Sequence, residues 1–344
     1  MEPTEALKPA VLWTPLEGRR VHCRLCGFNC RIAEGKLGHC AVRKNVDGKL
    51  YSLNYGKVVA GSPDPIEKKP LFHFLPGSRS FSIAAVGCNF RCEFCQNWQI
   101  SQAALEAGGV EGEPIAPEQI VEAAVRTGCR SVAYTYTEPT VFMELAQECG
   151  SVAKSQGLAN VFVSNGYMTR EAIDYGADWL DAINVDLKAF SDEYYRNLCS
   201  ARLQPVLDCI SHIARHTRIW MEITTLLLPG QNDSDEELRK LAGFLVSEAG
   251  PDVPWHISRF YPQYRYAESK ATSLESMRRA EEIGKAAGLR YVYLGNVPGE
   301  KSESTHCPGC GGRVIERMGY QIVANRIENS KCPHCGTEIA GFGL

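Results

Sequence analysis

Three cysteines, Cys88, Cys92 and Cys95, follow directly on a short apolar run at residues 81–86. The run is bounded by serine and glycine, a pattern that predicts a buried strand. Three thiolates at this spacing can hold an iron-sulfur cluster, but ordinary electron-transfer clusters are closed by four cysteines. The next cysteine, Cys129, comes only after a glycine-rich loop and a predicted helix. The sequence therefore predicts a cluster at the end of this strand, with one iron left open for chemistry.

A structural zinc site or a redox-sensing thiol group is the alternative for this loop, because clustered cysteines in a cytosolic chain commonly bind zinc. A zinc knuckle, however, usually pairs two C-x2-C elements. This loop has no such partner at the expected distance along the chain. We therefore expect the cluster.

The same loop resembles that of the radical S-adenosylmethionine (SAM) superfamily, in which C-x3-C-x2-C is combined with an aromatic residue before the last cysteine, here Phe94. Residues 88–97 are similar to the pyruvate formate-lyase activating enzyme branch. Roughly residues 20–300 resemble the radical SAM member of the AmmeMemoRadiSam system. The resemblance implies a 4Fe-4S cluster whose open iron is chelated by SAM. Reductive cleavage of SAM then gives a 5′-deoxyadenosyl radical, while the protein binds, orients and excludes water.

The composition is that of an ordinary globular chain, since 44% of the 344 residues are apolar and 22% are charged. The net charge of −3 gives no global footprint for nucleic acid or for an anionic membrane. Residues 1–10 contain acids and prolines where a signal peptide would need a basic start and an apolar stretch. No apolar run approaches the length of a membrane span. We expect a soluble, cytoplasmic protein.

Beyond the loop, strand-like and helical patterns alternate, which predicts parallel βα units. The expected strands are residues 131–136, 160–165, 182–188, 219–228, 255–261 and 291–294. The expected helices are residues 117–126, 141–156, 169–175, 203–215, 234–248 and 274–287. The predicted fold class is therefore α/β, a partial (β/α)6-type TIM barrel. We expect a Cys-rich N-terminal metal segment at 1–78, the radical SAM barrel at 79–300 and a zinc-ribbon-like module at 301–344.

Barrel enzymes build their sites from residues at the C-terminal ends of the strands and from the loops beyond them. We expect the residues selected by this rule to converge on the cysteine loop: Glu138, Ser164, Asn165, Asp186, Lys188, His256 and Arg259. A single histidine on a strand is more often a hydrogen-bonded core residue, and this alternative stays open for His256.

The resemblance implies cofactor contacts for several of these residues. Glu138 stands where the activating enzymes carry a Gly-Gly-Glu-Pro motif, so it would accept hydrogen bonds from the SAM amino group, although the two glycines are absent here. Residues 163–166 and 184–188 are similar to segments around the SAM carboxylate and ribose. Two structural alternatives remain: Glu138 could favour a helix N-terminus, and Asp186 and Lys188 could form an ion pair.

Two C-x2-C-G knuckles near the C-terminus are very close to the zinc-ribbon pattern, and their cysteines are Cys307, Cys310, Cys332 and Cys335. Residues 314–323 between the knuckles alternate in the manner of a β-hairpin. A rubredoxin-like iron site has the same spacing and is the alternative metal. Because four thiolates close the coordination sphere, the role of the module would be structural or for docking a partner.

Four further cysteines lie within a short N-terminal stretch: Cys23, Cys26, Cys30 and Cys40. Their spacing matches neither a bacterial ferredoxin run nor a standard zinc ribbon. Zinc is our first interpretation. A second iron-sulfur cluster that feeds electrons to the first is the alternative.

The remaining cysteines, Cys129, Cys149, Cys199 and Cys209, are expected to be small buried hydrophobes. Lys68 and Lys69 are expected to be a solvated charge pair. The aromatic residues near the strand expected at 255–261 could line a pocket for a flat molecule or simply pack in the core: Phe260, Tyr261, Tyr264 and Tyr266.

The sequence thus predicts a radical SAM enzyme of oxidoreductase type that uses a 4Fe-4S cluster and SAM on an unidentified substrate. A glycyl-radical-enzyme activase is the specific alternative within this class, and a non-catalytic, metal-stabilised protein-binding module is the alternative outside it. Expected partners are SAM, the substrate and a flavodoxin- or ferredoxin-like electron donor. The resemblance adds Memo-like and AMMECR1-like proteins as partners.

Overall fold

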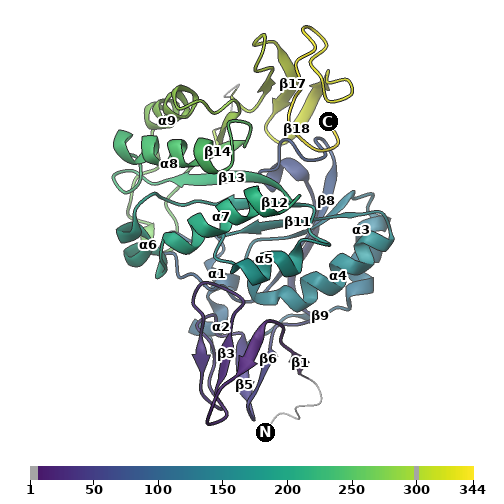
Figure 1. Cartoon of the computed structure of the whole chain (residues 1–344), viewed down its shortest axis with the longest axis vertical. Helices are drawn as coiled ribbons and strands as arrows, with labels where there is room; N and C mark the ends of the chain where they lie inside the picture. Colours follow the sequence, from purple (N-terminus) through teal and green to yellow (C-terminus); the bar gives the residue numbers. More distant parts are fainter. Residues whose placement is uncertain (1–6, 298–301) are drawn as a thin grey trace.

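The structure is a computed structural model that describes residues 7–297 and 302–344, and it has three parts along its longest axis (Figure 1). Small antiparallel sheets from the N-terminal residues lie at one end, a large α/β body lies in the middle, and the C-terminal hairpin lies at the other end. The predicted boundary between residues 300 and 301 falls outside the described residues. No helix in the described residues is both long and apolar enough to cross a membrane.

The body is built on one open sheet whose strands run in the order β15-β14-β13-β12-β11-β10-β8-β7-β9. Among the described residues its parallel strands are β8 (Arg79–Ala85), β10 (Ser131–Tyr134), β11 (Ala159–Ser164), β12 (Ala182–Asp186), β13 (Trp220–Leu227), β14 (Trp255–Arg259) and β15 (Val292–Gly295). Antiparallel strands β7 (Lys57–Pro65) and β9 (Glu113–Pro114) extend the sheet beyond β8. The sheet is therefore the predicted partial barrel, with an antiparallel extension that the sequence patterns did not indicate.

Helices connect successive parallel strands, as the alternating pattern predicts. They are α3 (Pro117–Arg126), α4 (Met143–Ser155), α5 (Arg170–Gly176), α6 (Asp192–Cys199), α7 (Gln204–His216), α8 (Asp235–Glu248) and α9 (Leu274–Ala286). Shorter helical turns are α1 (Trp98–Ser101), α2 (Ala103–Glu106), η2 (Ile66–Lys68), η3 (Pro139–Phe142) and η4 (Tyr264–Tyr266). The expected helix at 141–156 splits into η3 and α4, and α6 was not predicted.

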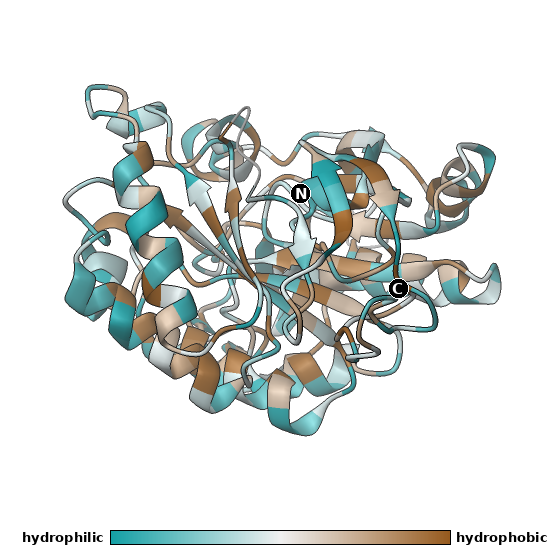
Figure 2. Ribbon diagram, turned by 90° about the horizontal axis from the view of Figure 1, so that it is seen from above, coloured by the Kyte–Doolittle hydropathy of each residue, from teal (hydrophilic) through white to brown (hydrophobic). Residues whose placement is uncertain are grey.

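Serine and threonine side chains cap several of these helices, which fixes where they begin. Thr169 caps α5, Ser191 caps α6, Ser234 caps α8 and Ser273 caps α9, each by accepting a hydrogen bond from a backbone amide of the first turn. The helices turn apolar stripes toward the sheet and polar faces outward (Figure 2).

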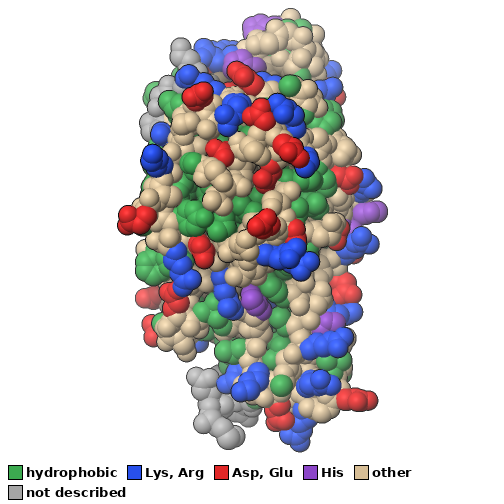
Figure 3. Space-filling view, turned by 90° about the vertical axis from the view of Figure 1, so that its left-hand side faces the viewer, with side chains coloured by type: hydrophobic (Ala, Val, Ile, Leu, Met, Phe, Trp, Pro, Cys, Tyr) green, Lys and Arg blue, Asp and Glu red, His purple; other side chains and the backbone are tan. Residues whose placement is uncertain are grey.

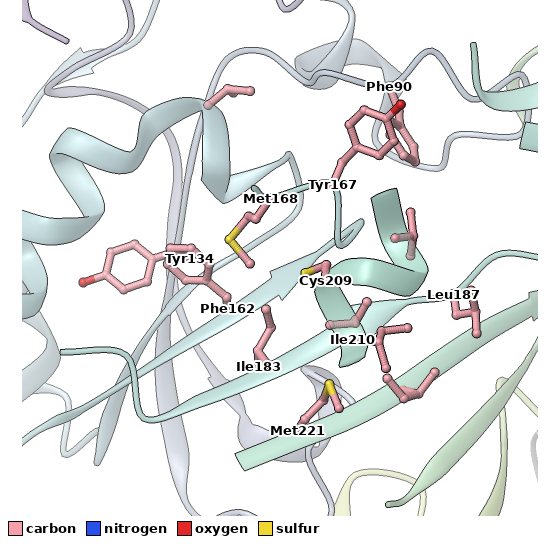
Figure 4. Close-up of a cluster of buried hydrophobic side chains, with 14 of the residues drawn as sticks. Phe90, Tyr134, Phe162, Tyr167, Met168, Ile183, Leu187, Cys209, Ile210 and Met221 are labelled. Carbon is pink, nitrogen blue, oxygen red and sulfur yellow. The ribbon is translucent and has the colours of Figure 1, made fainter. Parts of the chain in front are cut away.

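The main core lies between the sheet and these helices. A close-up of one part of it shows aromatic, aliphatic and sulfur-containing side chains from strands and helices meeting in one layer (Figure 4). Tyr134, Phe162 and Trp179 pack edge to face, with ring centroids 5.5–6.1 Å apart. Gly150 of α4 makes room for this group, because a Cβ there would lie 2.5 Å from the Trp179 ring. The core thus holds α4 tightly against the strands that carry the site.

The two ends of the chain form separate small sheets. The N-terminal sheets combine β1 (Lys8–Pro9), β6 (Lys49–Ser52) and β5 (Arg43–Val46), and β2 (Trp13–Pro15), β3 (Val21–Cys23) and β4 (Arg31–Ile32). The C-terminal sheet contains β16 (Thr305–His306), β17 (Arg313–Met318) and β18 (Gln321–Asn325). Strands β17 and β18 pair antiparallel, which confirms the hairpin expected at residues 314–323.

Candidate functional site

The loop that carries Cys88, Cys92 and Cys95 leaves the end of β8 and enters the mouth of the barrel. Gly87 starts it with a φ of +112°, and a Cβ there would lie 2.6 Å from Val42 Cγ1. Only glycine therefore lets the loop pass this close to the N-terminal segment. Cys92 is buried, whereas Cys88 and Cys95 are half-buried.

The three thiols line a cleft of about 290 Å3. Five of the six predicted cofactor contacts line the same cleft: Glu138, Ser164, Asn165, Asp186 and Lys188. They come from the ends of β11 and β12 and from the loops after β10, β11 and β12. These residues meet because parallel strands end at the same edge of the sheet.

Glu138 connects the ends of β10 and β11. It is 2% exposed and its Oε1 accepts hydrogen bonds from Thr140 N at 3.1 Å, from the Thr140 hydroxyl and from Ser164 Oγ at 2.8 Å. Its Oε2 accepts one bond, from Asn165 N at 2.8 Å. Burial raises the pKa of Glu138, and these donors act in the opposite direction. Glu138 also caps η3, so the structural alternative, a carboxylate at a helix start, is present in the same side chain.

Asn165 links this carboxylate to the cysteine loop. Its Nδ2 donates to Asn89 Oδ1 at 2.7 Å and lies 3.8 Å from Cys88 Sγ. A chain of contacts therefore runs from Glu138 through Asn165 to Cys88.

Asp186 and Lys188 form an ion pair at the mouth of the cleft, with Lys188 Nζ 2.9 Å from Asp186 Oδ2. Burial acts to lower the pKa of Lys188, but the charges of Asp186 and Cys92 outweigh it and hold this pKa well above its usual value. The Lys188 side chain is 13% exposed, so its charge acts at short range in a partly desolvated place. Asp186 and Lys188 therefore form the ion pair that was the structural alternative, and they also line the cleft.

Cys199, at the end of α6, contacts the cysteine loop. The neighbouring Cys199 thiol and the charge of Lys188 lower the pKa of Cys92. Backbone amides of Arg91 and Glu93 donate to the carbonyls of Cys199 and Leu198, both at 3.0 Å. Cys199 is fully buried, as expected, but it also lies against the cysteine loop. No local pattern could have placed it beside a loop so distant in the sequence.

His256 is a buried residue of β14 that lies outside the cleft but lines a second cavity beside it. Its Nε2 is 2.7 Å from Glu222 Oε2, and Glu222 also accepts hydrogen bonds from the amides of Phe72 and His73. His256 is thus a buried, hydrogen-bonded residue, as its structural alternative predicts. Arg259 also lies away from the thiols, where its Nε donates to Thr272 O at 2.8 Å.

A second cavity of about 550 Å3 adjoins the cleft. Lys68, Gln96, Thr224 and Ser258 line both spaces. The far wall of the second cavity comes from the C-terminal part of the chain, through Glu303, Gly319 and Tyr320. The cleft and the second cavity together form one chamber between the barrel and the C-terminal hairpin.

Of the two lysines expected to be solvated, Lys69 differs from expectation, and the aromatic residues divide between the two alternatives. Lys69 is 1% exposed and pairs with Asp64 at 2.8 Å, so it is not solvated. Burial lowers the pKa of Lys69 to about 8. Of the aromatic residues near the sixth strand, Tyr261 lines the second cavity, Phe260 is buried in the core, and Tyr264 stacks on Trp98 with ring centroids 5.0 Å apart.

Thr224 of β13 is a site residue that the sequence reasoning did not select. It is buried, lines the cleft, and its Oγ1 has no hydrogen-bond partner within the described part of the chain. An unpaired buried hydroxyl costs free energy unless a ligand satisfies it. Together with three thiols that leave one cluster iron open, it shows that the donor set of the cleft fits a cluster and a polar ligand.

The C-terminal cysteines form a compact four-thiol site. Their Sγ atoms all lie within 4.8 Å of one another, with 3.5 Å between Cys307 and Cys335 and 3.7 Å between Cys310 and Cys332. Zn–S bonds of about 2.3 Å in a tetrahedron would give sulfur separations of about 3.8 Å. The site is therefore shaped for a single tetrahedral metal ion.

One side of the molecule carries mixed charges around a band of apolar side chains (Figure 3). Lysine and arginine side chains are interspersed with aspartate and glutamate on this side. A basic stripe for a phosphate backbone would instead gather one sign of charge.

Comparison with known proteins gives four consistent similarities. Residues 82–242 match the model of the radical SAM superfamily. The chain is 40% identical to an uncharacterized protein of Methanocaldococcus jannaschii over 97% of this chain and 99% of that protein. It is 24% identical to the pyruvate formate-lyase 1-activating enzyme of Escherichia coli K12 over 72% of this chain and 92% of that enzyme. A radical SAM methyltransferase structure from Sphaerobacter thermophilus shares the fold, with a TM-score of 0.51 at 18% identity over 65% of this chain and 68% of that one.

Proposed function

The chain belongs to the radical SAM superfamily, and we propose that it holds a 4Fe-4S cluster on Cys88, Cys92 and Cys95 and cleaves SAM reductively in the adjacent cleft. The observation that carries the proposal is the convergence of three thiols and five strand-end polar residues on one cleft. The cluster and SAM supply the radical chemistry when bound. The substrate that the radical attacks would bind in the adjoining cavity.

The chain's own residues bind and orient the cofactor in this proposal. Among the described residues, Glu138 Oε2 accepts one hydrogen bond, from Asn165 N, which leaves it an acceptor site for the SAM ammonium group. Lys188 supplies a partly desolvated positive charge for the SAM carboxylate. Ser164, Asn165 and Asp186 contribute the remaining polar contacts. His256 is not included among these cofactor contacts, because Glu222 already pairs with its Nε2.

The second cavity supports a place for the substrate. It shares four residues with the cofactor cleft, and its volume is in the range of small-molecule sites, roughly 300–1,000 Å3. Its outer wall is formed by the C-terminal hairpin, which we propose is held in shape by zinc at Cys307, Cys310, Cys332 and Cys335. The hairpin would then close the substrate site as well as stabilise the end of the chain.

The test is anaerobic reconstitution with iron and sulfide, reduction with dithionite, addition of SAM, and measurement of 5′-deoxyadenosine by mass spectrometry. The wild-type chain should form this product and Cys92→Ala should not. Cys129→Ala is the matched control, since Cys129 is also a buried cysteine but does not line the cleft. Product from Cys92→Ala, or no product from a fully loaded and reducible wild type, would overturn the proposal. The second result would favour the non-catalytic binding module.

Activation of a glycyl radical enzyme is a second candidate function. Its support is the similarity to the Escherichia coli activating enzyme, which extends over 92% of that enzyme. If the two share a substrate, mixing the reduced chain with SAM and pyruvate formate-lyase should give the electron paramagnetic resonance signal of a glycyl radical. No signal above that of the Cys92→Ala variant would argue against this substrate. The resemblance to the AmmeMemoRadiSam system alone supports Memo-like and AMMECR1-like partners.

A further inference from the structure

The four N-terminal cysteines surround one small, enclosed cavity. Cys23 ends β3, Cys26 and Cys30 lie in the turn between β3 and β4, and Cys40 precedes β5. A backbone hydrogen bond from Cys23 N to Cys30 O, at 2.9 Å, brings the two sides of this turn together. The rest of the cavity wall is largely apolar and includes Leu25, Ile32 and Val141. A short stretch of chain thus presents four thiols to a protected interior space.

The spacing of these thiols differs from that of the C-terminal site. In residues 7–297 and 302–344, only the C-terminal four cysteines form a group of three or more metal-ligating side chains whose ligand atoms all lie within 4.8 Å of one another. The N-terminal thiols are spread farther than a single tetrahedral ion would hold them, since it would place sulfurs about 3.8 Å apart. Cys88, Cys92 and Cys95 are also spread beyond this limit. A four-iron, four-sulfide core needs such a spread, because it lies between its cysteine ligands.

A backbone amide points at one of the N-terminal thiols. His39 N donates to Cys30 Sγ at 3.5 Å. The His39 ring lines the cavity, and its buried Nε2 has no hydrogen-bond partner in the described residues. Amide donors of this kind stabilise the negative charge of ligated thiolates and tune the reduction potential of a cluster. The cavity therefore offers both the ligands and the surroundings of an iron-sulfur site.

One side chain connects this cavity with the loop of the first cluster. Arg91 lies between Cys88 and Cys92 in the sequence, and its Nη2 donates to His39 O, beside Cys40, at 3.1 Å. A Cβ on Gly87, the neighbour of Cys88, would lie 2.6 Å from Val42 Cγ1, two residues after Cys40. The loop of the first cluster therefore lies against the segment that carries Cys40. A purely structural metal would have no need of this position beside the reactive loop.

We propose that Cys23, Cys26, Cys30 and Cys40 hold a second 4Fe-4S cluster that relays electrons to the site at Cys88, Cys92 and Cys95. One electron enters from a flavodoxin- or ferredoxin-type donor and reduces the N-terminal cluster by one unit. The same electron then leaves for the first site, so the relay returns to its starting state, and no bond or proton changes. The relay role rests on the proposed function, whereas the iron content of the N-terminal site does not.

The first experiment counts metals in the full chain after anaerobic reconstitution. The wild type should contain about eight irons and about eight sulfides per chain, with about one zinc. A variant with Cys88, Cys92 and Cys95 all changed to alanine should keep about four irons and show an electron paramagnetic resonance signal after reduction. About two zincs and four irons in the wild type would overturn the proposal, and this result does not depend on the variant folding. Iron lost completely from a triple variant with a native circular dichroism spectrum would also overturn it.

The second experiment separates the relay from the first site. Cys30→Ala should remove about four irons per chain, and Cys129→Ala should remove none. We expect Cys30→Ala to lower 5′-deoxyadenosine formation with reduced flavodoxin at least tenfold more than formation with dithionite, which can reduce the first site directly. Equal losses with both reductants would contradict the relay while leaving the metal count intact. Absence of product from the wild type with dithionite would contradict the proposed function and not the second cluster.

Discussion

Replacement of Glu138 by glutamine tests how the cleft binds its cofactor, because this change keeps the shape of the side chain and removes its charge. The glutamine oxygen can take over the bonds that Oε1 now accepts from Thr140 and Ser164. The amide NH2 group must then face the Asn165 amide, which now donates to Oε2 at 2.8 Å. Two donors would meet, and one buried N–H would lose its partner at a cost of about 1–3 kcal/mol.

The same substitution should weaken SAM binding by a separate amount. Loss of a charged acceptor for the SAM ammonium group costs about 1.5–3 kcal/mol, which is roughly a 10- to 150-fold increase in Kd. Isothermal titration of the anaerobic, reconstituted protein with SAM measures this change. Thermal unfolding of the same samples measures the loss of stability, which we expect as a fall of several degrees in Tm.

Thr140→Val is the matched control for Glu138→Gln. It removes one hydroxyl donor to Oε1 but leaves the carboxylate and its charge in place. We expect a stability loss of about 1 kcal/mol and less than a threefold change in SAM affinity. If Glu138→Gln lowers Tm but binds SAM as tightly as the wild type, Glu138 only joins the strand ends and the cofactor contact is refuted. If Thr140→Val weakens SAM binding equally, the position of the carboxylate matters and its charge does not.

Three further predictions concern parts around the site. Burial lowers the pKa of His73 to about 4, from 6.5 in the unfolded chain. Between these two pH values the unfolded state binds a proton at His73 that the folded state does not, so the free energy of unfolding should rise with pH. His73→Gln should flatten this rise by up to roughly 3 kcal/mol in thermal unfolding at stepped pH, and an unchanged slope would refute it. Cys332→Ser should remove about one zinc per chain by elemental analysis, because the four-thiol site loses a ligand. Gly166→Ala should cost about 1–3 kcal/mol, since φ is +68° and the new Cβ would lie 2.6 Å from Val185 Cγ1; Gly176→Ala, with open space around it, should cost less.

The barrel could be predicted from the sequence because its strands are short and apolar and its helices have clear starting residues. Parallel strands buried on both faces produce continuous apolar runs such as 83–86, and proline at position 117 marks a helix start. The small N-terminal sheets escaped this reasoning because their strands are only two to four residues long. Such strands carry no detectable period.

The candidate site was predictable to the extent that it follows from strand direction. Ser164 and Asp186 are the last residues of their strands, and both line the cleft. His256 is the second residue of β14, and it lines the second cavity rather than the cleft. Cys199 and Asn89 acquire their roles only through contacts between distant segments. The rule on strand ends has no information about such contacts.

The C-terminal hairpin region returns to the segment that precedes β8, and this has a consequence for biosynthesis. Leu75 N donates to Phe342 O at 2.8 Å, Phe342 N donates to His73 O at 2.7 Å, and the Phe74 and Phe342 rings stack at 5.0 Å. His73 also bonds to Ala340, a residue 267 positions later in the chain. At about 5–20 residues per second on a ribosome, the earlier segment waits roughly 10–50 s for these partners. Phe74 therefore lacks its stacking partner in every unfinished chain until synthesis passes Phe342.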